Sequence, residues 1–113
     1  MMVAFKMPQS DPAELAGRED AIQTTTKGAA EVPMKVAERA VAVWARLGQL
    51  EAIAAASMKS DLQVARLMAE AGVRGAIANV EINLDGIKDE KYVAAKRQAV
   101  TALRDRLSVT AMA

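Results

Sequence analysis

The sequence has no cysteine and no histidine among its 113 residues. Without cysteine there is no disulfide framework and no thiolate chemistry. Without histidine the chain lacks the most common general base and the most common metal ligand of proteins, so we expect no metal site. Any proton transfer would therefore rest on Asp, Glu, Lys or Tyr side chains.

Long apolar runs and blocks of like charge are also absent from the sequence. No stretch is long enough to cross a membrane, and the N-terminus does not resemble a signal peptide, which predicts a cytoplasmic protein with no membrane partner. The net charge is only +1. Because neutralising phosphates needs a basic face, we expect no nucleic-acid partner.

Aromatic residues make up only 3% of the chain, whereas hydrophobic residues, many of them alanine, make up 52%. Alanine fills a core thinly, so helices should approach closely and a partner subunit should complete the burial. The length suits one domain or a piece of one, and residues 1–113 are expected to form one helical unit.

The first half of the chain has the pattern of two helices separated by a proline. Asp11 and Pro12 are typical of a helix start, and a helix is expected from about residue 12 to about residue 30, with Leu15 facing inward. Pro33 should kink the chain or start a new helix. The inward stripe of that second helix is expected to be Val36, Ala40, Val43, Leu47 and Leu50.

Two further helices follow in the second half. Ser60 and Gln63 form a capping-box pattern, so a helix should run from Ser60 to about residue 84 and end before Gly86. The last helix should start near Asp89. With the apolar residues 1–8 as the end of a truncated helix, the sequence predicts an all-α bundle of about four long helices that dimerises through helix packing.

The helix at 60–84 carries an unusual stripe, small in its middle and acidic or amidic at its ends. It consists of Asp61, Ala65, Met68, Gly72, Ala76, Asn79 and Asn83. Two interpretations remain open, namely close packing against another helix or a pocket that needs room and hydrogen-bonding groups. Asp61 and Asn79 are 18 residues apart in the sequence, which is roughly 27 Å along a helix, too far to share one small ligand. Two such helices crossing antiparallel about a two-fold axis would bring them together.

Each polar residue of this stripe has a functional and a structural interpretation. Asp61, with Ser60 beside it, is either an acid–base group or part of a helix start. Asn79 and Asn83 lie one turn apart and present two amides, which would suit either a heterocycle with an amide-like edge or a helix interface.

Four sequence elements resemble the cyclodeaminase/cyclohydrolase family. They are "FKMP" at 5–8 ahead of an acidic helix, "AAEVPM" at 29–34, "SDL" at 60–62, and Asn79-Val80 with Ile82-Asn83. Their order and spacing agree with the family over about residues 3–93. The family includes the C-terminal half of formimidoyltransferase-cyclodeaminase and stand-alone bacterial methenyltetrahydrofolate cyclohydrolases.

The resemblance implies an all-α homodimer that acts on a folate substrate without a metal or organic cofactor. The expected activity is formiminotetrahydrofolate cyclodeaminase or methenyltetrahydrofolate cyclohydrolase. Within this chain Asp61, Asn79 and Asn83 would bind or orient the substrate, with Ser60 in support as a substrate-binding residue, and Asp61 is the candidate catalytic group that the chain itself contains.

Two departures from the family pattern weaken the expected activity. Family domains are about twice as long, and their acid–base Asp would align upstream of Met1. Ala54 and Ala55 stand where the family often has Gly-Asn. The chain is therefore expected to be the C-terminal portion of such a domain with impaired catalysis. The alternative is a non-catalytic helical remnant or interaction module that keeps the dimer surface.

Overall fold

The structure of the chain is a computed structural model that describes the backbone of residues 12–112 and the side chains of residues 12–107. The "FKMP" element and Asp11 lie outside the described residues. The elements are α2 (Pro12–Ile53), the short 3₁₀ helix η1 (Ala56–Met58), α3 (Lys59–Leu84) and α4 (Glu90–Met112). Residues 12–112 contain no strand, which confirms the all-α prediction.

The first two expected helices are one continuous helix, α2, with Pro33 inside it. The predicted boundary near residue 30 is therefore wrong. Pro33 removes a single backbone hydrogen bond, whereas Ala30, Met34 and Ala37 on either side of it are at most 3% exposed. Burial on both sides of the proline outweighs the lost bond and keeps the helix continuous.

The predicted inward stripe of α2 is also wrong in its helical phase. Val36, Val43 and Leu50 are about half exposed, and so is Leu15. The buried residues of α2 are instead Thr26, Ala30, Met34, Ala37, Val41 and Trp44. Because α2 carries apolar residues on both faces, periodicity alone could not decide which face meets the core.

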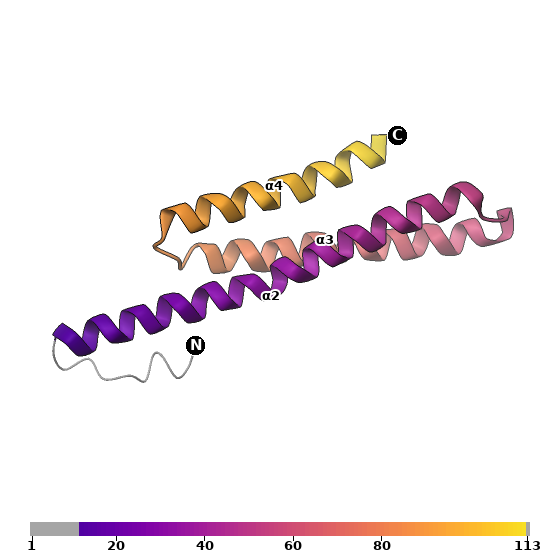
Figure 1. Cartoon of the computed structure of the whole chain (residues 1–113). Helices are drawn as coiled ribbons and strands as arrows, with labels where there is room; N and C mark the ends of the chain where they lie inside the picture. Colours follow the sequence, from indigo (N-terminus) through magenta and orange to yellow (C-terminus); the bar gives the residue numbers. More distant parts are fainter. Residues whose placement is uncertain (1–11, 113) are drawn as a thin grey trace.

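The helices α2 and α3 run side by side in opposite directions, and α4 lies along the pair, as Figure 1 shows. The core is a thin strip between α2 and α3, extended under α4 by Val100, Leu103 and Leu107. The described chain measures 68 × 24 × 14 Å, and its radius of gyration is 19.1 Å. A compact chain of this length would have a radius of about 13 Å. Much apolar surface on α2 and α3 is therefore left exposed.

The sequence predicted the bounds of α3 and the start of α4 closely. The helix α3 starts one residue before Ser60 and ends at Leu84. The helix α4 begins after Asp89, whose Oδ1 accepts a hydrogen bond from the backbone N–H of Tyr92 at 3.1 Å. Among residues 12–112, no helix is long and apolar enough to cross a membrane.

Candidate functional site

An open groove of about 440 Å³ lies between α2 and α3. It is lined by Ala29, Val32, Pro33 and Val36 from α2 and by Gly72, Ala76, Asn79 and Asn83 from α3. Four of the seven residues of the unusual stripe on α3 thus form one wall of this α2–α3 groove. Apolar side chains and the proline of α2 form the opposite wall.

The polar groups of the α2–α3 groove are the two asparagines, which are the only asparagines in the chain. Asn83 donates from Nδ2 to the backbone oxygen of Asn79 at 2.8 Å, so the two side-chain amides are not bonded to each other. The Asn79 amide has no hydrogen-bond partner within the described part of the chain. Asn79 keeps both its donor and its acceptor for a ligand, and Asn83 keeps its carbonyl oxygen.

Gly72 and Gly75 are not explained by packing within the described residues. A Cβ atom at Gly72 would meet only the Cβ of Ala40, at 4.0 Å, and one at Gly75 would meet nothing within 4 Å. Gly72 is exposed and opens the α2–α3 groove. Close packing by a helix of the same chain therefore does not account for these glycines, and packing against a partner helix stays a prediction.

Ser60 and Asp61 are exposed residues at the start of α3. The residue at the N-cap is Met58 and no side chain caps the helix, so the prediction that Ser60 caps it is wrong. Asp61 lies in the first turn, where a carboxylate is favoured by the helix dipole. Neither residue lines the α2–α3 groove, and the structure does not bring them together with Asn79 and Asn83.

No carboxylate, lysine or tyrosine is among the residues that line the α2–α3 groove. No group of three or more His, Cys, Asp or Glu side chains that could hold a metal occurs within residues 12–107. The groove of a single chain therefore offers shape and two amides, but no group that transfers a proton.

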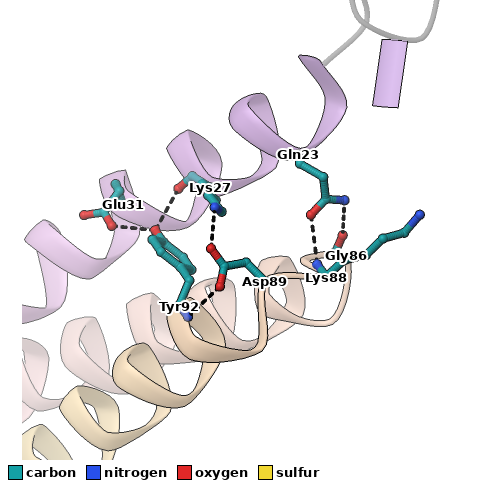
Figure 2. Close-up of polar contacts among 7 residues, drawn as sticks. All are labelled: Gln23, Lys27, Glu31, Gly86, Lys88, Asp89 and Tyr92. Atoms are coloured by element: carbon teal, nitrogen blue, oxygen red, sulfur yellow. Dashed lines mark hydrogen bonds and ion pairs between the residues drawn. The ribbon is translucent and has the colours of Figure 1, made fainter. Parts of the chain in front are cut away.

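A second polar cluster, which sequence reasoning missed, joins α4 to α2 (Figure 2). The phenol of Tyr92 donates to Oε1 of Glu31 at 2.5 Å, and Lys96 forms an ion pair with the same carboxylate at 2.7 Å. Burial, followed by the hydrogen bond to Glu31, raises the pKa of Tyr92 to about 12. The hydrogen bonds from Lys96 and Tyr92 lower the pKa of Glu31.

These shifts fix the protonation of the cluster at neutral pH. Tyr92 stays protonated as a donor and Glu31 stays ionised as an acceptor, so neither is poised to exchange a proton. Lys27 adds an ion pair to Asp89 at 2.9 Å. The Oε1 of Gln23 accepts a hydrogen bond from the backbone N–H of Lys88 at 2.8 Å, and its Nε2 donates one to the backbone oxygen of Gly86 at 3.1 Å (Figure 2). The cluster holds the loop and the start of α4 on α2. The one signal in the sequence that could have singled out Tyr92 is that it is the only tyrosine of a chain with few aromatic residues.

At the far end of the α2–α3 pair, Arg66 stacks on Trp44. Its guanidinium carbon lies 4.1 Å from the ring centroid, and its Nη1 lies 3.8 Å from Oε2 of Glu51. A Cβ atom at Gly48 would lie only 2.8 Å from Nη2 of Arg66. Gly48, which costs helix stability, is therefore explained by the close approach of this guanidinium.

A family model described as formiminotransferase-cyclodeaminase matches residues 1–102 of the chain. The formimidoyltransferase-cyclodeaminase of Gallus gallus is 43% identical over 102 residues, which are 90% of this chain and 19% of that protein. The proteins of the same name from Sus scrofa and Rattus norvegicus are 36% and 37% identical over 100 residues, 88% of this chain and 18% of each relative.

The chain thus spans about a fifth of the length of these relatives, and the match falls in their C-terminal part. The family model covers nearly the whole chain and reaches from the N-terminus through both asparagines into α4. The chain therefore belongs to the formiminotransferase-cyclodeaminase family.

Proposed function

We propose that the α2–α3 groove binds a one-carbon adduct of tetrahydrofolate, with Asn79 and Asn83 as the groups that recognise it. The observation that carries the proposal is the pairing of an apolar wall with two amides in one groove. Val32, Pro33 and Val36 suit the flat face of a heterocycle. The free donor and acceptor of Asn79 suit an amide-like edge, such as that of a pterin ring.

The proposed reaction is that of a formiminotetrahydrofolate cyclodeaminase or a methenyltetrahydrofolate cyclohydrolase. In the first, N10 attacks the formimino carbon, the imino nitrogen takes up the N10 proton and one further proton, and the bond between carbon and that nitrogen breaks to release ammonia and leave the methenyl bridge. In the second, water adds to the methenyl carbon, the bond from this carbon to N5 breaks, and of the two water protons one goes to N5 and the other is released. Both need a carboxylate that moves a proton and dipoles that steady the cation. We assign the carboxylate role to Asp61, supported by Ser60, and no metal or organic cofactor takes part.

Since the groove of one chain contains no carboxylate, we expect the isolated chain to be a weak catalyst that works as a cytoplasmic homodimer. The same observation favours a second candidate, a non-catalytic helical module that keeps the dimer surface. Turnover of methenyltetrahydrofolate above its spontaneous hydrolysis separates the two. Such turnover should fall in the Asp61→Asn variant if the chain is an enzyme, and should be absent in both proteins if it is a module.

Folate binding itself is tested by calorimetry with 5-formyltetrahydrofolate. Asn79→Leu roughly preserves volume but removes the donor and acceptor, and each lost hydrogen bond should weaken binding by about 1–3 kcal/mol. The matched control is Gln98→Leu, which removes an exposed amide from α4 and should leave affinity unchanged. Equal affinities of Asn79→Leu and the parent chain would assign Asn79 a structural role and remove the proposal.

A further inference from the structure

Pro33 costs α2 helix stability and does not belong to the buried core. Proline is the least favourable residue inside a helix, and Pro33 neither begins nor ends α2. Its neighbours Ala30, Met34 and Ala37 form the core at this level. Pro33 itself is half-buried and lines the α2–α3 groove. The reason for a proline at this position is therefore to be sought in the groove.

A proline inside a helix leaves one backbone carbonyl without its usual hydrogen bond. In α2 this carbonyl belongs to Ala29, four residues before Pro33, because proline has no N–H and its ring pushes that oxygen aside. No side chain among residues 12–107 donates a hydrogen bond to it. Ala29 and Pro33 both line the groove, so the oxygen between them lies on the groove side of α2.

This oxygen changes what the α2 wall of the groove can recognise. The side chains of that wall are all apolar, and the side-chain amides of the groove belong to α3. With the Ala29 oxygen, a ligand between the walls meets the amides of Asn79 and Asn83 on one side and a carbonyl on the other. A backbone carbonyl accepts hydrogen bonds and donates none. The ligand group that faces it must therefore be a donor, an N–H or an O–H.

We infer that the Ala29 carbonyl, freed by Pro33, is a substrate-binding group that accepts a hydrogen bond from the exocyclic amino group of a pterin. The inference rests on the proposed function and names the part of the folate that the groove recognises. A pterin presents this amino group beside a ring N–H and a carbonyl. The ring N–H and the carbonyl match the adjacent acceptor and donor of an asparagine amide, and the amino group pairs with Ala29.

The variant Pro33→Ala tests the inference, because it gives residue 33 an N–H that occupies the Ala29 oxygen and adds no bulk to the groove. In calorimetry its affinity for 5-formyltetrahydrofolate should be about five- to tenfold lower than that of the parent chain. The midpoint of urea unfolding should rise, since α2 gains a hydrogen bond and loses a proline. Damage to the fold would lower affinity and stability together. An unchanged affinity of Pro33→Ala would overturn the inference.

A second ligand separates the lost acceptor from the lost ring carbons of the proline. The probe is the analogue of 5-formyltetrahydrofolate in which a methyl group replaces the amino group of the pterin. The parent chain should bind it about five- to tenfold more weakly than 5-formyltetrahydrofolate, and this preference should shrink in Pro33→Ala. Val32→Ala, which trims the same wall and leaves the backbone unchanged, is the matched control and should keep the full preference. An undiminished preference in Pro33→Ala would overturn the inference.

Two NMR measurements follow the Ala29 oxygen itself. In ligand-free Pro33→Ala, the new amide at residue 33 should exchange slowly with D₂O because it is bonded to Ala29, and fast exchange would contradict the inference. In the parent chain, the carbonyl carbon resonance of Ala29 should move during titration with 5-formyltetrahydrofolate. A resonance that stays in place at saturating ligand would overturn the inference.

Failure of the inference is distinguishable from failure of the proposed function. A parent chain that does not bind 5-formyltetrahydrofolate in calorimetry would remove the proposed function, and the inference with it. If the parent chain binds and Asn79→Leu weakens binding whereas Pro33→Ala does not, the groove is the folate site and only the role of the Ala29 carbonyl is refuted.

Discussion

Replacing Tyr92 by phenylalanine removes one hydroxyl from the cluster that holds α4 on α2. The ring remains, and with it the contacts of Lys27 and Lys96, whose Nζ atoms lie 5.1 and 5.5 Å from its centroid. The lost interactions are the hydrogen bond to Glu31 at 2.5 Å and a longer one to the backbone oxygen of Lys27 at 3.3 Å, of which the first is the stronger. A bond to a charged group is worth about 1.5–3 kcal/mol, and partial exposure of the Glu31 side chain places this one at about 1–2 kcal/mol.

The same variant changes how stability depends on pH. The pKa of Tyr92 is raised in the folded chain from 10.0 to about 12. A raised pKa means that the phenol contributes its full stabilisation below pH 10 and loses it as the pH rises toward 12. Lysines also lose their protons in this range, but they do so in both proteins, so the difference between them isolates the phenol.

The assay is urea unfolding followed by helical circular dichroism at pH 8 and at pH 11. Tyr92→Phe should be less stable than the parent chain by about 1–2 kcal/mol at pH 8, and this gap should shrink at pH 11. Thr101→Val, at an exposed position of α4 away from the cluster, is the matched control and should show no pH-dependent gap. Equal stability of Tyr92→Phe and the parent at pH 8, or a gap that stays constant to pH 11, would refute the role of this hydrogen bond.

Two other substitutions test the glycines. In Gly48→Ala the new Cβ would displace the Arg66 guanidinium from Trp44; the lost stacking, about 0.5–1 kcal/mol, is offset by a gain in helix propensity of about 1 kcal/mol. Stability should therefore hardly change while Trp44 fluorescence shifts, and an unchanged emission spectrum would contradict the proposed contact. Gly72→Leu should fill the α2–α3 groove, abolish binding of 5-formyltetrahydrofolate and leave helical content intact. A variant that binds normally would show that the ligand lies elsewhere.

The parts of the fold that could be predicted are the helix ends, because residues close in the sequence determine where a helix begins and ends. The bounds of α3 and the start of α4 follow from end signals near Ser60, Gly86 and Asp89, although no side chain caps the start of α3. The failure at Pro33 has a physical reason. One lost hydrogen bond is a local effect, whereas the burial that outweighs it depends on α3, about 40 residues further along the chain.

One of the two walls of the candidate site could be predicted, because its residues belong to a single helix. The wall from α3, with Gly72, Ala76 and the two asparagines, is a pattern within one helix and can be found by its spacing. The wall from α2, with Val32 and Val36, could not be found, because those residues read equally well as core. Asp61 stays a prediction, since no contact within the described chain links it to the groove.

The central claim is that the α2–α3 groove binds folate through its asparagines. NMR spectroscopy of the side-chain amide groups tests this claim most directly. The chain has only two asparagines, Asn79 and Asn83, so its asparagine side-chain NH₂ signals report on the groove alone. The glutamine side chains serve as internal controls in the same ¹⁵N-labelled sample. Titration with 5-formyltetrahydrofolate should move both asparagine signals and leave the glutamine signals in place. Asparagine signals that stay unchanged at saturating ligand would contradict the claim.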